Sequence, residues 1–160
     1  MIRRAVLALI LLGLAGGTAG QAGAGSCAED RVDLRGPHGK ARFSVEIADT
    51  VEERALGLMN RDKMAASHGM LFIYDREQPV AFWMENTLIP LDMLFIDSHG
   101  VVQTVHANAR PLDRTSIPSG VPVQMVLEIN GGLAARLGIE PGSELRHPRL
   151  DQAEAAWPCD

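Results

Sequence analysis

Apolar and polar residues form short segments along the chain, and turn-forming residues separate them. In residues 41–49 the two kinds alternate and Phe43, Val45 and Ile47 share one face, which predicts a strand. The apolar run at residues 70–74, which Asp75 ends, predicts a strand at residues 70–75 that is buried on both faces. The other expected strands are residues 31–36 at a sheet edge, 80–84, the hairpin partners 91–97 and 101–109, residues 123–129 and a last strand within 139–147.

Residues 50–60 combine a helical period with a start signal. Thr50 and Glu53 have the spacing of a capping box, in which each side chain accepts a hydrogen bond from the other residue's backbone N–H. One face of this predicted helix carries the apolar side chains of Val51, Ala55 and Leu58, with Leu56 and Met59 beside it. Gly57 lowers the helix propensity, and we expect another backbone to pack closely against it.

A second, shorter helix is expected at residues 131–138, with Asn130 as its N-cap and Gly138 as its C-cap. Short connections join most of the predicted strands, which favours antiparallel pairing. The expected fold is therefore α+β: a compact, mostly antiparallel, strongly bent sheet or partial β-barrel with two short helices.

Residues 1–24 have the pattern of a secretory signal peptide. Two arginines precede an apolar run at residues 5–15, and small residues follow. The run is too short for a membrane span, which needs about 20 residues. Cleavage is expected after Ala19 or Ala24; an uncleaved anchor, or a lipid on Cys27, are the alternatives.

The mature chain is expected to comprise an N-terminal arm (25–41), one globular domain (42–147) and a C-terminal tail (148–160). Cys27 and Cys159 are the only two cysteines and lie near its two ends. Because export brings them into an oxidising compartment, we predict a disulfide between arm and tail. The alternative is two thiols that are free or used independently.

Composition and charge narrow the range of partners. With 46% hydrophobic and 22% charged residues in 160 positions, the chain can bury the core of one ordinary domain. Removal of the signal peptide leaves 13 basic and 20 acidic side chains, a formal charge of −7. This excess of acid argues against nucleic acid and anionic membranes as partners. A periplasmic or secreted location is predicted, with no stable membrane span after cleavage.

Four ordered blocks carry a resemblance to a known family: EERALGLMNR, GMLFIYD, FWMENTLIPLDMLFID and VLEINGGLAARLGIEPGS. Over about Phe43–Arg146 the chain resembles domain-of-unknown-function family 192, whose members are small and often exported bacterial and archaeal domains. The resemblance implies a compact, β-rich fold with short helices, and it implies no activity. This chain departs from the family at Glu85, where members commonly carry a basic residue.

Polar groups interrupt the apolar run at residues 81–97, and they permit two interpretations. Structurally, Asn86 and Thr87 close a turn, while Asp92 accepts backbone hydrogen bonds or pairs with Arg54. Functionally, an aromatic side chain with amides and carboxylates suits a sugar or another polar envelope ligand. The candidate ligand-binding residues are then Arg54, Trp83, Glu85, Asn86, Thr87 and Asp92.

The surface loop at residues 109–122 is a second candidate for binding. Its charged residues Arg110, Asp113 and Arg114 would suit an anionic ligand or a protein partner. We expect this loop to extend the candidate site. The leading functional interpretation is a non-catalytic binding or accessory module for an envelope ligand or protein partner, and the catalytic status of the chain stays open.

Two other functions remain possible from the sequence. A small envelope hydrolase would need a carboxylate pair drawn from Glu85, Asp92, Asp97 and Glu128. A periplasmic copper protein would bring Met64 and His68 together with a third ligand. The chain contains no Gly-x-Ser-x-Gly elbow and no Gly-rich phosphate loop, and we assign no catalytic residue, metal site or cofactor.

Overall fold

The computed structural model describes residues 27–159. The predicted signal peptide lies outside the described residues. The sheet strands are β1 (Arg31–Gly36), β2 (Gly39–Ala48), β3 (His68–Gln78), β5 (Leu91–Ile96), β6 (Val102–Ala109), β8 (Val123–Asn130) and β9 (Glu144–Arg146). A separate two-stranded sheet contains β4 (Ala81–Phe82) and β7 (Ile117–Pro118), and the two helices are α1 (Val51–Leu56) and α2 (Leu133–Leu137).

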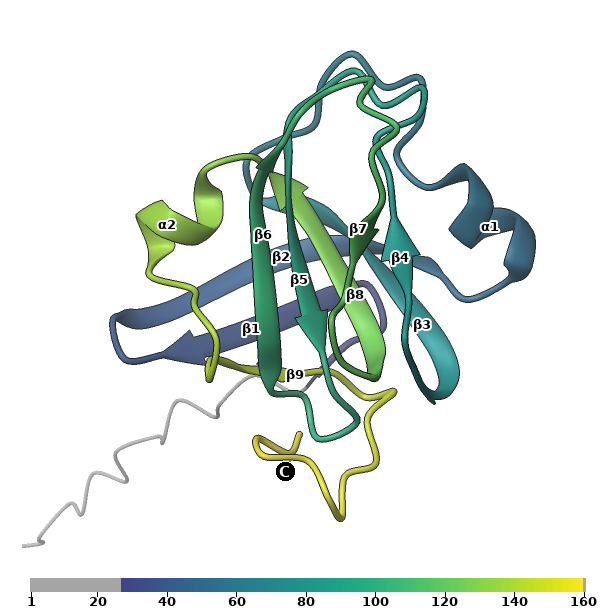
Figure 1. The fold of residues 1–160 in the computed structure, drawn as a ribbon. Coiled ribbons are helices and arrows are strands. Elements are labelled where there is room, and N and C mark those ends of the chain that lie inside the picture. Colours follow the sequence, from purple (N-terminus) through teal and green to yellow (C-terminus); the bar gives the residue numbers. More distant parts are fainter. Residues whose placement is uncertain (1–26, 160) are drawn as a thin grey trace, which may run out of the picture.

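The seven strands form one strongly curled sheet in the order β6-β5-β8-β3-β2-β1-β9 (Figure 1). Only β2 and β3 pair in parallel, because α1 lies in the connection between them; every other pairing between these strands is antiparallel. The two ends of the sheet meet where Val102 N–H donates to Ser143 O at 2.8 Å and Leu145 N–H donates to Gly100 O at 2.7 Å. The expected α+β fold with a partial barrel is confirmed.

Two strands differ from the prediction. β1 was expected at a sheet edge, but β9 pairs along its outer side, so β1 lies inside the sheet and within the segment expected to be an arm. Residues 80–84 were expected to form a full strand, but only Ala81 and Phe82 do so. They pair with Ile117 and Pro118 of the long loop instead of joining the main sheet.

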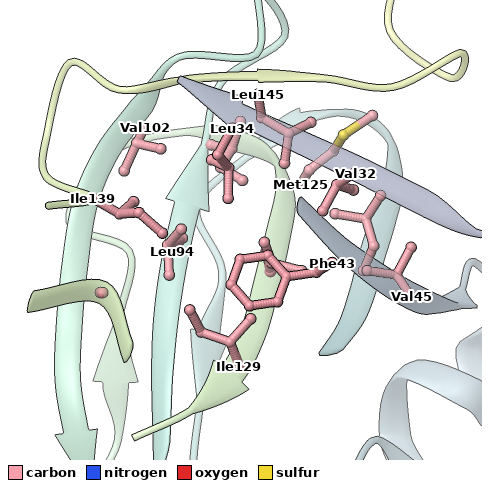
Figure 2. Packing of buried hydrophobic residues seen from close by; sticks show 14 of the residues in the cluster. Val32, Leu34, Phe43, Val45, Leu94, Val102, Met125, Ile129, Ile139 and Leu145 are labelled. Atoms are coloured by element: carbon pink, nitrogen blue, oxygen red, sulfur yellow. The ribbon is translucent and has the colours of Figure 1, made fainter. Parts of the chain in front are cut away.

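Hydrophobic side chains pack on both faces of the curled sheet. The inner cluster fills the barrel and includes alternate residues of β8, namely Met125, Leu127 and Ile129. Figure 2 shows Met125 and Ile129 within this cluster. The second cluster covers the outer face and includes Met70, Phe72, Met84, Met93 and Phe95. The central strands are therefore buried on both faces, as the sequence predicts for residues 70–75.

The first helix is shorter and more exposed than expected. The Thr50–Glu53 capping box is confirmed, but Gly57, with φ of 48°, ends the helix. Val51 and Leu56 are 70% and 60% exposed, so the expected packed face was wrong. The ring of Phe72 lies against Gly57, where a Cβ would come within 3.3 Å of its Cζ. The positive φ and this side-chain contact therefore favour glycine here. The expected close packing of another backbone against Gly57 is wrong.

The second helix begins at Leu133 with Gly132 as its N-cap, and Asn130 provides no side-chain cap. The side-chain amide of Asn130 instead donates to the carbonyl oxygens of Met64 and Ala65. The expected Asn130 cap is thus wrong, while the C-cap Gly138, with φ of 66°, is confirmed. The two helices lie on opposite sides of the molecule (Figure 1).

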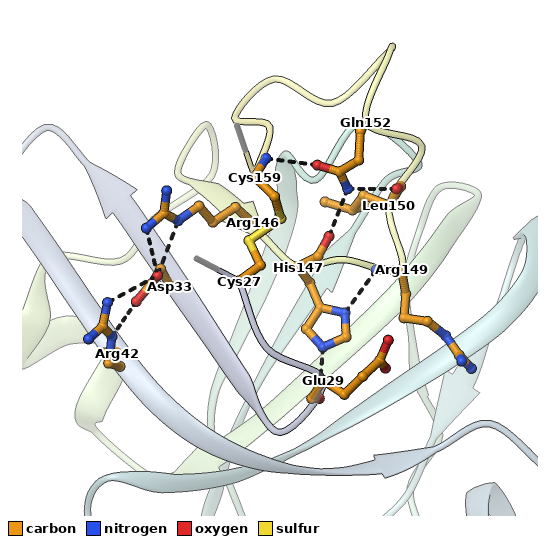
Figure 3. Close-up of a disulfide and its surroundings, with 10 residues drawn as sticks. All are labelled: Cys27, Glu29, Asp33, Arg42, Arg146, His147, Arg149, Leu150, Gln152 and Cys159. Carbon is orange, nitrogen blue, oxygen red and sulfur yellow. Dashed lines mark hydrogen bonds and ion pairs between the residues drawn. A yellow bond between two sulfur atoms is a disulfide. The ribbon is translucent and has the colours of Figure 1, made fainter. Parts of the chain in front are cut away.

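The predicted disulfide is present: Cys27 and Cys159 are bonded, with their Cα atoms 5.6 Å apart (Figure 3). It joins the two ends of the described chain over the β1–β9 side of the barrel. Nearby, Asp33 accepts hydrogen bonds from Arg42 and Arg146. Burial works to raise the pKa of Asp33, but these two guanidinium groups hold it below its usual value.

Candidate functional site

A small pocket lies where α1, the loop after it and the segment following β4 meet the outer face of the sheet. Its volume is about 40 Å³, room for roughly three water-sized groups. Trp83 and Leu56 line it and remain 51% and 60% exposed, so they form its rim. The other lining residues are Arg54, Ala55, Gly57, Leu58, Met59, Phe72, Phe82, Thr87 and Glu128.

The segment Met84–Thr87 is a tight turn beside the pocket, and its last residue, Thr87, lines the pocket. Thr87 N–H donates to Met84 O at 3.2 Å, and the Thr87 hydroxyl donates to Glu85 O at 3.2 Å. Asn86 has φ of 52°, a conformation that asparagine accepts more readily than most residues. Asn60 N–H donates to Asn86 O at 2.8 Å, which ties the turn to the segment after α1. Asn86 and Thr87 therefore close the turn, as the structural interpretation expected.

Arg54 contributes a positive charge beside the pocket. One of its guanidinium nitrogens, Nη1, donates to Asp49 O and, at 2.8 Å, to Ile73 O. The guanidinium carbon lies 4.9 Å from the centroid of the Tyr74 ring. These contacts fix Arg54 on the outer face of β3, so the suggested pairing of Arg54 with Asp92 is wrong.

Asp92 lies apart from the pocket, on the inner face of β5. It is completely buried, and its carboxylate accepts three backbone hydrogen bonds. The donors are Asn108 N–H at 2.8 Å, Gly132 N–H at 2.9 Å and Ala134 N–H at 2.8 Å. Asp92 thereby caps α2 and joins it to β6, which is the acceptor role that the structural interpretation expected.

Glu85 and the long loop form a polar surface next to the pocket. The Glu85 carboxylate pairs with Arg114 at 2.5 Å. Backbone hydrogen bonds dock the loop on the turn: Leu112 N–H donates to Thr87 O and Met84 N–H donates to Asp113 O. The structure thus brings the loop, the turn and Arg54 together, as the sequence predicts for the extended site, and it leaves Asp92 outside.

Glu128 lines the pocket but is not among the ligand-binding residues that the sequence predicts. It was considered only as one of four candidate carboxylates, although the apolar alternation of β8 already placed it opposite Met125, Leu127 and Ile129. Glu128 is 4% exposed and lines the pocket. In the sheet its neighbours are Met70 of β3 and Met93 of β5.

No group in the described part of the chain donates a hydrogen bond to the carboxyl of Glu128 or forms an ion pair with it. Burial among apolar side chains raises the pKa of Glu128 to about 8. Arg54 and Tyr74 are the other ionisable groups nearby, and burial raises the pKa of Tyr74 as well. Burial therefore favours the protonated form of Glu128 at neutral pH.

The four carboxylates considered for hydrolysis do not converge. Asp92 faces the inner cluster, whereas Glu128 faces the outer one. Glu85 pairs with Arg114. Asp97 accepts the backbone N–H groups of His99 and Val101 and holds its own hairpin turn. Only Glu128 of the four lines the pocket.

The copper candidates Met64 and His68 line one shallow hollow on another part of the surface, about 440 Å³ in volume. Arg61, which pairs with Glu46, and Lys63 line the same hollow, and their charges disfavour a bound cation. Within residues 27–159 no group of three or more His, Cys, Asp or Glu side chains is placed to hold a metal ion. In the same range no helix has the length and apolarity to cross a membrane.

Residues 34–147 match the model of domain-of-unknown-function family 192, described as an uncharacterized ACR. The chain belongs to this family. The match includes both helices and eight of the nine strands in full, and the resemblance read from the sequence is confirmed. The family description assigns no activity.

Two solved structures of similar proteins share the fold. One is from Sinorhizobium meliloti 1021 and is described as a candidate transcription regulator; it is 46% identical, with a TM-score of 0.72, and the match covers 78% of this chain and 97% of that one. The other, from Novosphingobium aromaticivorans DSM 12444, is of unknown function; it is 41% identical, with a TM-score of 0.72, over 82% and 99% of the two chains. No curated protein matches the chain.

Proposed function

We propose that this protein is an exported, non-catalytic binding or accessory module that recognises a cell-envelope ligand or protein partner at the pocket between α1 and the Met84–Thr87 turn. The observation that carries the proposal is the exposed apolar rim formed by Trp83 and Leu56. Exposure of such an apolar rim to water is unfavourable. Ligand sites are usually concave, apolar surfaces that carry a few polar groups.

Binding is better supported than hydrolysis. A hydrolase of the kind considered needs two carboxyl groups that face one cleft, and Glu128 is the only one of the four candidates at the pocket. The regulator description belongs to the S. meliloti protein. The 20 acidic against 15 basic side chains of this chain do not favour nucleic acid as its partner.

Two features support export: the signal-peptide pattern of residues 1–24 and the disulfide between Cys27 and Cys159. Expression of the full sequence in a bacterium, followed by mass spectrometry of the periplasmic and membrane fractions, tests this part. A periplasmic product cleaved after Ala19 or Ala24 is expected. Recovery of the intact chain from the membrane fraction alone would oppose it.

A thermal-shift screen of the periplasm-purified protein against envelope sugars and peptidoglycan fragments tests the binding site. A ligand that binds only the folded state raises the melting temperature by mass action. The shift is expected to disappear in Trp83→Ala and Leu56→Ala. Leu137→Ala is the matched control, because Leu137 is an exposed leucine of the other helix. A shift that persists in Trp83→Ala would place the binding elsewhere.

A further inference from the structure

Glu128 presents its carboxyl group to the pocket. In residues 27–159 no completely enclosed side-chain nitrogen or oxygen lacks a hydrogen-bond partner. The carboxyl of Glu128 has no such partner, although the residue is only 4% exposed. Its oxygens must therefore touch accessible space, and the pocket that Glu128 lines provides that space.

The surroundings of Glu128 decide which protonation state faces this space. Met70 and Met93 flank it on the neighbouring strands, and Phe72 and Phe82 line the same pocket. A carboxylate in such apolar surroundings, without a partner, is costly, so the group stays protonated. A protonated carboxyl carries an O–H that can donate a hydrogen bond.

The rest of the pocket favours a ligand that accepts hydrogen bonds. Arg54 places a positive charge beside it, which disfavours a cationic ligand. The Thr87 hydroxyl already donates to Glu85 O. Tyr74, a further ionisable side chain near Glu128, keeps its proton because burial raises its pKa. Among the residues that line the pocket, ionisation of Glu128 is therefore expected to change its polarity between about pH 6 and 9.

Resting on the function proposed above, we propose that Glu128 is a neutral hydrogen-bond donor that binds a carbonyl-type oxygen of the ligand. The volume of about 40 Å³ admits only the tip of a ligand, such as an amide, N-acetyl or carboxylate group. The body of the ligand then packs on Trp83 and Leu56 at the rim. Ionisation of Glu128 removes the donor and repels the ligand oxygen.

Methionine methyl groups offer a direct measurement. In the full chain labelled with ¹³C-methyl methionine, Met70 and Met93 report on Glu128, while Met125 in the inner cluster is an internal reference. Propionamide, propionate and propylamine present a neutral carbonyl, a carboxylate and an ammonium on the same body. Propionamide is expected to shift Met70 and Met93 at pH 6 and to bind about tenfold more weakly at pH 9. Propionate is expected to lose at least as much affinity, and propylamine to bind least.

Variants separate the donor from simple packing. Glu128→Gln keeps an N–H donor, so it is expected to retain propionamide binding and to lose the pH dependence. Glu128→Met keeps the approximate volume and removes the donor, so binding should be lost. Glu140→Gln makes the same side-chain replacement at an exposed site away from the pocket and should behave as the wild type.

Three outcomes would overturn the inference in distinguishable ways. If propionamide binds Glu128→Met as well as it binds the wild type, the pocket binds ligands but Glu128 is not the donor. If propylamine binds most tightly, and more so at higher pH, the pocket is a cation site. If no probe shifts Met70 or Met93 at any pH, the pocket binds none of these groups, and the proposed binding site falls together with the donor role.

Discussion

Asp92 accepts a hydrogen bond from the backbone N–H of Ala134 at 2.8 Å, across 42 positions of the sequence. The same carboxylate accepts the N–H groups of Gly132 and Asn108, so one side chain joins β5, β6 and the start of α2. A helix of five residues whose first N–H groups are buried cannot obtain these partners from water. The acid in the middle of an apolar strand is thus a structural acceptor.

Asp92→Ala is therefore expected to lower the free energy of unfolding by about 2–4 kcal/mol, because three backbone donors lose a charged acceptor. Asp92→Asn should cost less, since it retains the oxygen that accepts from Asn108 and Gly132. Asp75→Ala, at an exposed position, is the control and should stay within about 0.5 kcal/mol. Urea unfolding followed by circular dichroism measures all three, and an unchanged Asp92→Ala would refute the role.

Loss of the disulfide is expected to lower the free energy of unfolding. Cys27 and Cys159 close a loop with a sequence separation of 132, for which the chain-entropy model gives at most about 5 kcal/mol. The tail has other anchors, including the hydrogen bond from Cys159 N–H to the side chain of Gln152 (Figure 3), so the expected loss is smaller. Cys27→Ser/Cys159→Ser should unfold at lower urea concentration than the wild type. Non-reducing peptide mapping should show the linked peptides, and free thiols would contradict the assignment.

Local signals and long-range partners explain which features the sequence could predict. The Thr50–Glu53 capping box is contained within four residues, and the hairpin of β5 and β6 has its turn between its strands. Both were predicted correctly. The cap of α2 comes from Asp92, far away in the sequence, so the nearer Asn130 was assigned that role in error.

The candidate site was predicted only in part for the same reason. Trp83 and Thr87 belong to a distinctive local stretch and do line the pocket. Arg54 reaches it because α1 crosses between the parallel strands β2 and β3, a connection that local patterns do not reveal. Glu128 interrupts the apolar strand β8, a signal as clear as that of Asp92. The sequence did not show that Asp92 would find partners while Glu128 would not.

The protonation of Glu128 predicts how stability depends on pH. Its pKa rises from 4.5 to about 8 on folding, so between these values the unfolded chain releases a proton that the folded chain keeps. This contribution to stability is fully present below about pH 4.5 and is lost as the pH rises, by up to about 1.4 kcal/mol per pH unit. The free energy of unfolding of Glu128→Gln, minus that of the wild type, should therefore increase from pH 5 to pH 8. A constant difference would show that Glu128 is ionised in the folded protein.

His147 is expected to make stability fall as the pH is lowered, which is the opposite of the effect of Glu128. Its ring is completely buried, Nε2 lies 2.9 Å from Glu29 O, and Nδ1 accepts the N–H of Arg149 (Figure 3). A neutral ring with its proton on Nε2 satisfies both contacts. Burial lowers the pKa of His147 below 6.5, so under acidic conditions the unfolded chain takes up a proton that the folded chain does not.

The contribution of His147 to stability is thus present above about pH 6.5 and is lost as the pH falls, by up to about 1.4 kcal/mol per pH unit. His147→Gln keeps a donor for Glu29 O but cannot be protonated, so its stability should fall less than that of the wild type between pH 6.5 and 5. The contact with Glu154 O raises the pKa of the exposed His99, so the contribution of His99 to stability changes with pH in the opposite direction. Because His99 is present in both proteins, this contribution cancels in the comparison. His106→Gln, at an exposed site, is the control. Equal acid sensitivity of His147→Gln and the wild type would show that His147 is protonated in the folded chain.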